Sequence, residues 1–232
     1  MLNLKNIAFI GSSGGIGQAF VDVLSRQYSN ANLYPFSRTA EYRIDYASED
    51  SIAEAANIAS KTGPLDLVIV ANGMLHSKEI MPEKSIKELA RYKFQQLFEV
   101  NTIVPSLIAK HFLPHLNRDY PSIFAALSAR VGSISENELG GWYGYRASKA
   151  ALNMIIKNAS IEIGRRNKKA IIVGLHPGTV DTDLSRPFHK NVPVEKLLTP
   201  HQSVTKLLEV LVSLTPAQSG KCFAWDGEEI LP

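Results

Sequence analysis

The run GSSGGIG at residues 11–17 constrains the fold more than any other stretch of this chain. It follows a short apolar run at 7–10 and opens an amphipathic run at 17–27, which are typical of a buried strand and a helix. A glycine turn between a strand and a helix lets the backbone approach a pyrophosphate, which the free N–H groups of the helix N-terminus bind. The alternative is a merely flexible turn, but its position favours a dinucleotide site. The predicted contacts in this loop are Gly11, Ser13, Gly15, Ile16 and Gly17.

The rest of the chain alternates strand-like and helix-like runs, which predicts parallel βαβ units in one α/β domain spanning residues 1–232. We expect strands at 7–10, 32–36, 43–45, 65–72, 122–128, 170–176 and 221–227. We expect helices at 17–27, 147–164 and 201–213, and one or two long helices across 84–116. The interval between 32–36 and 43–45 is shorter than the roughly 10–12 residues of a helical crossover. Either that helix is absent or one of the two strands is misplaced.

Charge and cysteine content exclude several classes of protein. The 25 Lys and Arg residues nearly balance the 22 Asp and Glu residues, and they are scattered, which argues against a nucleic-acid-binding surface. The single cysteine, Cys222, excludes an intrachain disulfide and fits a reducing compartment. No apolar run approaches the roughly 20 residues of a membrane helix, and the first one is too short for a signal peptide. We therefore expect a cytoplasmic protein without a membrane partner, and we assign no metal ligands.

The segment PFSRT at 35–39 bears on which dinucleotide binds, because the residue that ends the second strand contacts the adenosine ribose. An acidic residue there would repel a 2′-phosphate, whereas this chain has Ser37 followed by Arg38. Arginine can bind phosphate through two parallel hydrogen bonds, so the pair favours NADP over NAD. Alternatively, Arg38 is a solvated turn residue.

In WYGYRASKAA (142–151), Tyr145 and Lys149 lie four residues apart, which places them on one face of the predicted helix. A phenol with a pKa of about 10 is a poor acid or base at neutral pH, and an adjacent ammonium is expected to lower that pKa. Tyr145 could then protonate a carbonyl oxygen as hydride arrives, or deprotonate an alcohol in reverse. Tyr143 has no basic residue at the same spacing, so Tyr143 and Trp142 are interpreted as pocket wall or packing.

Together these motifs resemble the short-chain dehydrogenase/reductase family. The stretch LSARVGSISENELGGWYGYRASKAALN (127–153) is similar to its C-factor-like, sniffer-type carbonyl reductase branch. The resemblance implies a doubly wound Rossmann sheet of about seven strands with helices on both faces. It also implies a small carbonyl or alcohol substrate, and a homodimer or homotetramer formed through the helices at 84–116 and 147–164. The chain departs from the family pattern at Ile10, where threonine is usual, and at Gly14, where many NADP-using relatives carry a basic residue.

The resemblance assigns further roles around the cofactor. Asp45 is expected to hold the adenine amino group with Tyr46 beside the ring, and Lys149 to hold the nicotinamide ribose. Asn101 is expected to support a water relay to Lys149, although an asparagine in an apolar helix can also serve a helix-bending hydrogen bond. Two loops complete the site, VANG (70–73) along the adenosine ribose and HPGTVDTDL (176–184) along the carboxamide and pyrophosphate. Their predicted contacts are Ala71, Asn72, Gly73, Pro177, Gly178, Val180 and Thr182.

A serine is the one family residue without a clear counterpart. The resemblance implies a serine at the end of the fifth strand that orients the substrate carbonyl, and alignment of AALSARVGSI (125–134) puts Ala129 there. Ser128 is adjacent, but neighbouring strand residues point to opposite faces, so it substitutes only if the strand end bends. Ser133 substitutes only if its loop folds back. In a serine-free site, Tyr145 alone would hold the oxygen.

The segment 185–200 corresponds to a substrate lid in the family. Its side chains could attract an anionic or aromatic substrate, or could be solvated; they are Arg186, Phe188, His189 and Lys190. Two functions fit the sequence. The first is NADPH-dependent reduction of a small carbonyl compound. The second is a dinucleotide-binding signalling or regulatory protein with little turnover.

Overall fold

The computed structural model describes residues 4–191, 193 and 196–232. A seven-stranded sheet forms its centre, in the order β2-β1-β3-β4-β5-β8-β9. All neighbours in this sheet are parallel except β8 and β9, which pair antiparallel. Its strands are β1 (Asn6–Ile10), β2 (Asn32–Phe36), β3 (Leu67–Val70), β4 (Ser122–Leu127), β5 (Ala170–His176), β8 (Cys222–Ala224) and β9 (Glu229–Ile230). A separate parallel pair joins β6 (Thr179–Val180) to β7 (Leu197–Leu198).

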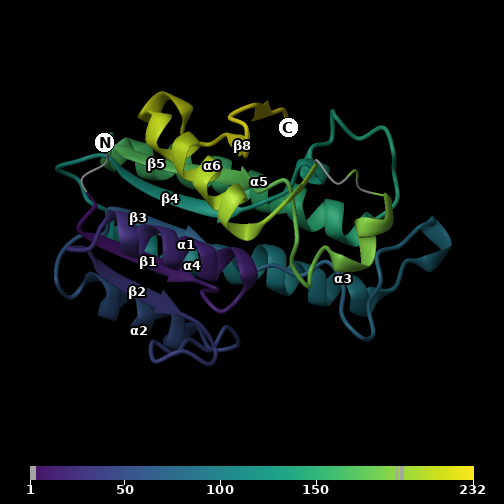
Figure 1. Cartoon of the computed structure of the whole chain (residues 1–232), viewed down its shortest axis with the longest axis horizontal. Coiled ribbons are helices and arrows are strands. Elements are labelled where there is room, and N and C mark those ends of the chain that lie inside the picture. Colours follow the sequence, from purple (N-terminus) through teal and green to yellow (C-terminus); the bar gives the residue numbers. More distant parts are fainter. Residues whose placement is uncertain (1–3, 192, 194–195) are drawn as a thin grey trace.

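Helices cover both faces of the sheet, which confirms the predicted doubly wound Rossmann fold (Figure 1). One face packs against α1 (Gly15–Gln27) and α6 (Pro200–Ser213). The opposite face packs against α2 (Glu49–Ser60), α4 (Val104–Phe112) and α5 (Tyr143–Arg166). The central strands β1, β3 and β4 are buried along their whole length, because both of their faces are covered.

The helical region predicted at 84–116 is one long run interrupted by a π-helical segment. It consists of α3 (Arg91–Phe98), the π-helical segment Glu99–Ile103, and α4, followed by the 3₁₀ turn Leu113–His115. Further 3₁₀ turns lie at Ile86–Glu88, Arg130–Gly132, Arg186–Asn191 and Pro216–Gln218. Within the described residues, none of the helices combines the length and apolar character needed to cross a membrane.

The strand predicted at 43–45 is wrong. Only an isolated parallel bridge between Ser37 and Arg43 forms there, so the sheet ends at β2 and no crossover helix is needed. The antiparallel strand β9 at the opposite edge brings the sheet to seven strands. The helix α2 was not predicted. It begins after Ser48, whose side chain accepts a hydrogen bond from the N–H of Ser51, an ordinary N-terminal cap.

Candidate functional site

The glycine loop joins β1 to α1 and leaves no room for side chains. Gly11 has a φ of 85°, and a Cβ there would lie 2.9 Å from the backbone nitrogen of Asn72. A Cβ on Gly17 would lie 2.1 Å from the carbonyl oxygen of Gly11. The N–H groups of Gly11 and Ser12 both donate to the carbonyl of Phe36, at 3.0 and 3.1 Å. The loop is therefore a fixed, close-packed turn.

The N-terminus of α1 is open to an anion. Its N-cap, Gly14, offers no side-chain hydrogen bond, and the first turn holds no acidic residue. Thr182 lies over this helix start, because a Cβ on Gly15 would come within 2.8 Å of its Cγ2. Of the other predicted loop contacts, Ser13 is exposed and Ile16 is half-buried against the core. The loop geometry fits a pyrophosphate, since free N–H groups and the positive end of the helix dipole face the same place.

The loop after β5 carries the predicted P-G segment to the same edge. Gly178 has a φ of 78°, and a Cβ there would lie 2.7 Å from Cδ1 of Trp225. The carbonyl of Pro177 accepts a hydrogen bond of 2.6 Å from Ser203 at the start of α6. Val180 is buried in β6 and leads directly to Thr182. The motif is thus held by α6 and delivers Thr182 to α1.

The adenosine side combines Ser37, Arg38, Asp45 and Tyr46. Ser37 is buried, and its hydroxyl oxygen accepts hydrogen bonds from the N–H groups of the next turn, whereas Arg38 is exposed. Burial raises the pKa of the Tyr46 phenol, while the nearby Arg38 guanidinium and Gly11 backbone oppose that rise. Asp45 is exposed, and its carboxylate accepts a hydrogen bond of 3.0 Å from the N–H of Ala47. Tyr46 therefore lies near both the Gly11 backbone of the glycine loop and the Arg38 guanidinium.

Lys149, Asn101 and Gly73 converge from three elements. Nζ of Lys149 is buried and donates a hydrogen bond of 2.9 Å to the carbonyl of Leu127, the last residue of β4. A Cβ on Gly73 would lie 3.6 Å from Oδ1 of Asn101 and 3.7 Å from Nζ of Lys149. Burial lowers the pKa of Lys149 to about 8. The loop after β3, which also carries Ala71, therefore brings its backbone against the two predicted polar groups.

Asn101 lies in the π-helical segment and is fully buried. Its Oδ1 accepts a hydrogen bond from the N–H of Met74, and its Nδ2 donates to the carbonyl of Met74, both at 2.8 Å. Nδ2 also donates to Oγ of Ser148 at 3.1 Å. Asn101 thus joins the loop after β3 to α5, a structural role compatible with the predicted relay. π-Helical turns occur often at functional sites.

Asn72, in the loop after β3, donates a hydrogen bond to the carbonyl of Val100. Its buried Oδ1 has no protein partner among the described residues.

Tyr145 lies in the first turn of α5, one turn before Lys149. Nζ of Lys149 is 5.9 Å from the centroid of the phenol ring. Burial raises the pKa of Tyr145 to about 12, so the predicted lowering by the neighbouring ammonium is wrong for this structure. The cause is burial, because taking the phenolate out of water disfavours the charged form of Tyr145.

The hydroxyls of the two candidate serines form hydrogen bonds with residues other than Tyr145. Oγ of Ser128 donates to Oδ1 of Asn153 on α5 at 2.6 Å. Oγ of Ser133 accepts from the N–H of Glu136 at 3.1 Å. Ala129 instead packs in the same buried cluster as Tyr145. The structure therefore packs the methyl group of Ala129 in the cluster that holds Tyr145, while both serine hydroxyls have hydrogen-bond partners elsewhere in the protein.

An aromatic wall surrounds Tyr145. The ring of Trp142 is 6.3 Å from that of Tyr145 and 5.0 Å from that of Phe188, and the Phe188 ring is 5.8 Å from that of His76. Tyr143 is exposed and is not part of this wall. The remaining members of the wall are Met74, Leu75, Leu97, Ala129 and Val131. His76 was not predicted, because no local pattern marks it.

The lid predicted at 185–200 is described in part. The 3₁₀ turn Arg186–Asn191 contributes Phe188 to the wall, and Arg186 points to Asp183 in an exposed ion pair of 2.8 Å. His189 meets Oγ of Ser185 at 2.7 Å, while Lys190 is exposed. Residues 192, 194 and 195 of the predicted lid lie outside the described residues. Phe188 is thus the one predicted lid side chain that contacts the wall among those described.

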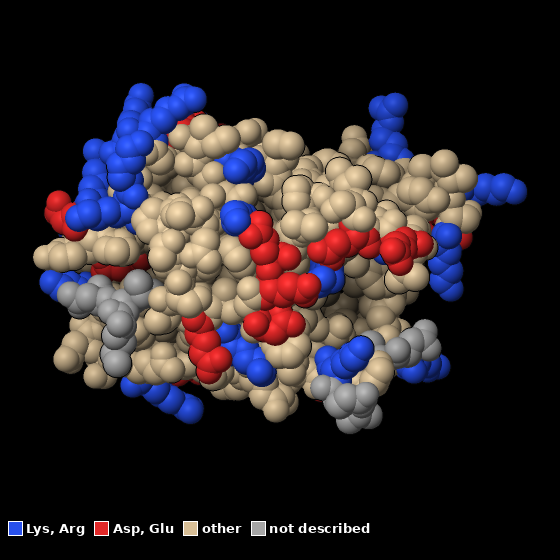
Figure 2. Space-filling view, turned by 90° about the horizontal axis from the view of Figure 1, so that it is seen from above, with Lys and Arg blue, Asp and Glu red and all other residues tan. Residues whose placement is uncertain are grey.

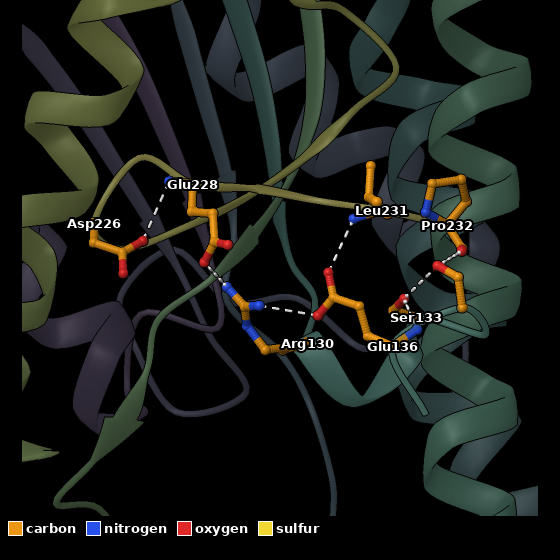
Figure 3. A network of polar contacts seen from close by, with 8 residues as sticks. Arg130, Ser133, Glu136, Asp226, Glu228, Leu231 and Pro232 are labelled. Carbon is orange, nitrogen blue, oxygen red and sulfur yellow. Dashed lines mark hydrogen bonds and ion pairs between the residues drawn. The ribbon is translucent and has the colours of Figure 1, made fainter. Parts of the chain in front are cut away.

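A polar network ties the C-terminal residues to the loop after β4 (Figure 3). The guanidinium of Arg130 pairs with Glu136 at 2.9 Å and with Glu228. The N–H of Leu231 donates to Glu136 at 3.2 Å, and the N–H of Ser135 donates to the carbonyl of Pro232 at the same distance. This network braces the loop that holds Ala129 and Ser133. Its partners come from distant parts of the chain, so the sequence did not reveal it.

The surface charges follow no single pattern. Figure 2 shows one face with acidic side chains gathered across its middle and Lys and Arg side chains mainly toward its edges. No continuous basic patch covers this face. Among the described residues, no group of three or more His, Cys, Asp or Glu side chains is arranged to hold a metal ion.

Comparison with known proteins gives this geometry a family context. The family described as short chain dehydrogenase matches residues 5–193. A 1-hydroxy-2-glutathionyl-2-methyl-3-butene dehydrogenase of Rhodococcus sp. (strain AD45) is 31% identical over 202 residues, covering 86% of this chain and 83% of the relative. The C-signal of Myxococcus xanthus is 32% identical over 178 residues, covering 77% of this chain and 98% of the relative.

Solved structures share the fold at lower identity. The NADPH-bound carbonyl reductase from chicken fatty liver has a TM-score of 0.81 at 24% identity, with 100% of both chains covered. The carbonyl reductase Sniffer of D. melanogaster has a TM-score of 0.79 at 21% identity, covering 99% of this chain and 100% of that one. These likenesses establish that the whole described chain adopts their architecture.

Proposed function

This chain belongs to the short chain dehydrogenase family, and we propose that it is an NADPH-dependent reductase of a small, uncharged carbonyl compound. The observation that carries the proposal is the convergence of Gly73, Asn101 and Lys149 one helical turn from Tyr145, at the sheet edge where the open N-terminus of α1 also lies. This edge, at the carboxyl ends of parallel strands, is where open α/β sheets bind ligands.

The two pKa shifts set the protonation states in which Tyr145 and Lys149 would begin carbonyl reduction. NADPH, held by the glycine loop and Lys149, would supply the hydride that adds to the carbonyl carbon. Tyr145, whose pKa of about 12 keeps it protonated at neutral pH, donates its phenolic proton to the developing alkoxide. Lys149, with a pKa of about 8, is mainly an ammonium at neutral pH and can return a proton toward Tyr145. Asn101 holds the loop and helix on either side of this path.

In this proposal the site works without a catalytic serine. The carbonyl oxygen receives its hydrogen bond from Tyr145, and Ala129 closes the position beside it. The aromatic wall of Trp142, Phe188 and His76 favours uncharged substrates with a flat apolar part, since such groups stack on aromatic rings. This wall supports a reductase of small aryl carbonyls.

NADPH is the proposed cofactor because of the adenosine side. Arg38 is exposed at the end of β2 and lies near Tyr46, where a 2′-phosphate would project. A guanidinium recognises phosphate better than a ribose hydroxyl. The chicken carbonyl reductase of the same fold binds NADPH, which agrees with this choice.

Self-association through the long helices stays a prediction. An apolar surface groove lined in part by Phe94, Phe98 and Ile103 lies on α3 and the π-helical segment, where the predicted interface would form. Sedimentation of the purified protein would test it, and a monomer at micromolar concentration would contradict it.

The decisive experiment follows NADPH oxidation over a panel of aryl aldehydes, aryl ketones and quinones. Wild type is expected to turn over part of the panel, and Tyr145→Phe is expected to bind NADPH normally but to lose nearly all turnover. If wild type and Tyr145→Phe are equally inactive while NADPH binds, the reductase function is wrong. The second candidate, a dinucleotide-binding signalling protein, would then be favoured by the likeness to the C-signal of Myxococcus xanthus and by Ala129 at the serine position.

A further inference from the structure

The turn before α5 is built from three consecutive left-handed residues. Gly140, Gly141 and Trp142 have φ values of 61°, 65° and 51°. Trp142 is the one non-glycine residue with a positive φ in the described part of the chain. A side chain in this conformation costs roughly 1–2 kcal/mol, and such strain is found where function requires it. Here the turn sets the indole of Trp142 against Tyr145.

Glu83 contacts this turn through both its backbone carbonyl and its side-chain carboxyl group. Its carbonyl oxygen accepts a hydrogen bond of 2.5 Å from the N–H of Trp142, and its Oε2 accepts one of 3.2 Å from the N–H of Gly144. Glu83 is fully buried, and its Oε1 has no hydrogen-bond partner among the described residues. Burying a carboxyl group with one unpartnered oxygen costs free energy, so its presence at this position indicates a specific role.

The packing around Glu83 is tight. A Cβ on Gly144 would lie 2.8 Å from Cδ1 of Leu97 and 3.3 Å from Oε1 of Glu83, so α3, Glu83 and α5 meet without spare room. On the other side of the turn, Nε of Arg146 donates to the carbonyls of Gly140 and Gly141, at 3.2 and 3.1 Å. Glu83 thus accepts from N–H groups of the turn, and Arg146 donates to its carbonyls. The helix itself supplies no side-chain cap at Trp142.

We propose that Glu83 is a positioning residue for Tyr145. Its carboxyl group accepts the N–H of Gly144, and its backbone carbonyl accepts the N–H of Trp142. Together these contacts fix the first turn of α5 and aim the phenol and the indole into the site, and substitutions at position 83 remove only the first of them. The carboxyl group of Glu83 accepts a hydrogen bond from Gly144, and the side-chain carbonyl of a glutamine can do so in part. The inference rests on the proposed reductase function for its kinetic consequence, but the clamp on the turn is measurable without turnover.

The test compares Glu83→Ala and Glu83→Gln with the control Glu79→Ala. Glu79 is an exposed glutamate four positions before Glu83. For Glu83→Ala we expect kcat to fall about 10- to 100-fold, because a displacement of about 1 Å at a reacting group has that effect. The Kd for NADPH should stay unchanged. Glu83→Gln should recover most of kcat, and Glu79→Ala should behave as wild type. Amide hydrogen exchange over residues 140–149 should rise in Glu83→Ala and stay low in the other two.

Three outcomes would overturn the proposal. One is a Glu83→Ala variant with wild-type kcat and exchange. Another is a parallel loss of turnover and NADPH binding, which indicates general damage. The third is a Glu83→Gln variant as impaired as Glu83→Ala. If wild type itself shows no turnover but binds NADPH, the proposed function fails, and the exchange of residues 140–149 alone decides whether Glu83 clamps the turn.

Discussion

The helices α1 and α5 both begin at glycine turns, yet their N-termini are used in opposite ways. Neither N-cap residue, Gly14 or Trp142, provides a side-chain hydrogen bond, and neither first turn contains an acidic residue. At α1 the turn presents free N–H groups toward the sheet edge, whereas at α5 a buried Glu83 accepts one of them. The N-terminal, positive end of the α1 dipole is thus available to a ligand, whereas the N-terminus of α5 already forms a hydrogen bond with Glu83.

This difference assigns distinct work to the two helices. An open N-terminus binds an anion through its backbone, so the side chains of α1 matter less than its glycines. At α5 the N–H of Gly144 is already bonded to Glu83, and the groups of α5 that face the proposed chemistry are its side chains Tyr145 and Lys149. The same local motif therefore serves cofactor binding in one place and the aiming of an acid in the other.

The largest expected effect comes from Gly17→Ala at α1. The new Cβ would lie 2.1 Å from the carbonyl oxygen of Gly11, which is backbone and cannot turn away. We expect the loop to open, NADPH binding to be lost, and the free energy of unfolding to fall by more than about 3 kcal/mol. Fluorescence titration with NADPH and chemical denaturation would measure both. Gly14→Ala is the control, because its Cβ would be at an ordinary 3.5 Å from Gly11; equal binding by the two variants would contradict the close-packed turn.

Arg38→Ala should have the next largest effect. Hydrogen bonds to charged groups contribute about 1.5–3 kcal/mol, so the Kd for NADPH should rise roughly 10- to 100-fold while that for NADH changes little. Isothermal titration with both cofactors would measure this, with the exposed Arg43→Ala as control. A wild type that binds NADH more tightly than NADPH would contradict the choice of NADPH. An unchanged Kd for NADPH in Arg38→Ala would show that Arg38 is a solvated residue, and an equal loss for both cofactors would show that it does not recognise the 2′-phosphate.

The sequence predicted the features that depend on local chemistry. The strands at 32–36 and 170–176 have the predicted bounds. The second is buried over nearly its whole length and therefore leaves a continuous apolar run, whereas the first is buried only at Tyr34 and Phe36. Gly11 and Gly17 were identifiable because only glycine fits their positions. The fold and the family followed from these motifs and are confirmed.

Features that depend on long-range contacts were missed or wrong. Glu83 and its partner Gly144 are 61 positions apart, and nothing near Glu83 in the sequence marks it as buried. The pKa of Tyr145 was predicted to fall because the i+4 spacing reveals Lys149 but not the burial of the phenol. The strand at 43–45 was wrong because three residues with alternating character can form a single bridge as easily as a strand. The unpredicted α2 did leave a signal, in the cap at Ser48 and the helical spacing of Ile52, Ala55, Ala56 and Ala59.

The third prediction concerns the charge on α5. The pKa of Lys149 is about 8, so raising the pH through 8 removes its ammonium, while Tyr145, at about 12, stays protonated. Reduction should therefore slow above pH 8, approaching a tenfold loss for each further pH unit. Steady-state kcat from about pH 6 to about pH 10, at saturating NADPH, would show this limb. If kcat stays constant up to about pH 10, the ammonium of Lys149 is not needed for reduction. Tyr145 would then be the one side chain of α5 that takes part in proton transfer.

The smallest expected effect isolates the conformational cost of the turn at α5. Gly140 and Gly164 both have open space around a new Cβ, but Gly140 has a φ of 61° while Gly164 lies inside the α5 helix. Gly140→Ala should destabilise the protein by about 1 kcal/mol, because alanine disfavours the left-handed region. Gly164→Ala should stabilise it by up to about 1 kcal/mol, because alanine is the better helix former.

Chemical denaturation of the two variants provides a matched comparison, since the same atoms are added in both and contacts change in neither. Effects of opposite sign would establish that the turn before α5 is held left-handed against its own preference. Equal effects would mean that Gly140 relaxes to another conformation at no cost. In that case the turn before α5 would not need Glu83 to hold it. The two helices would then differ only in that the N–H groups at the start of α1 are free to bind a ligand.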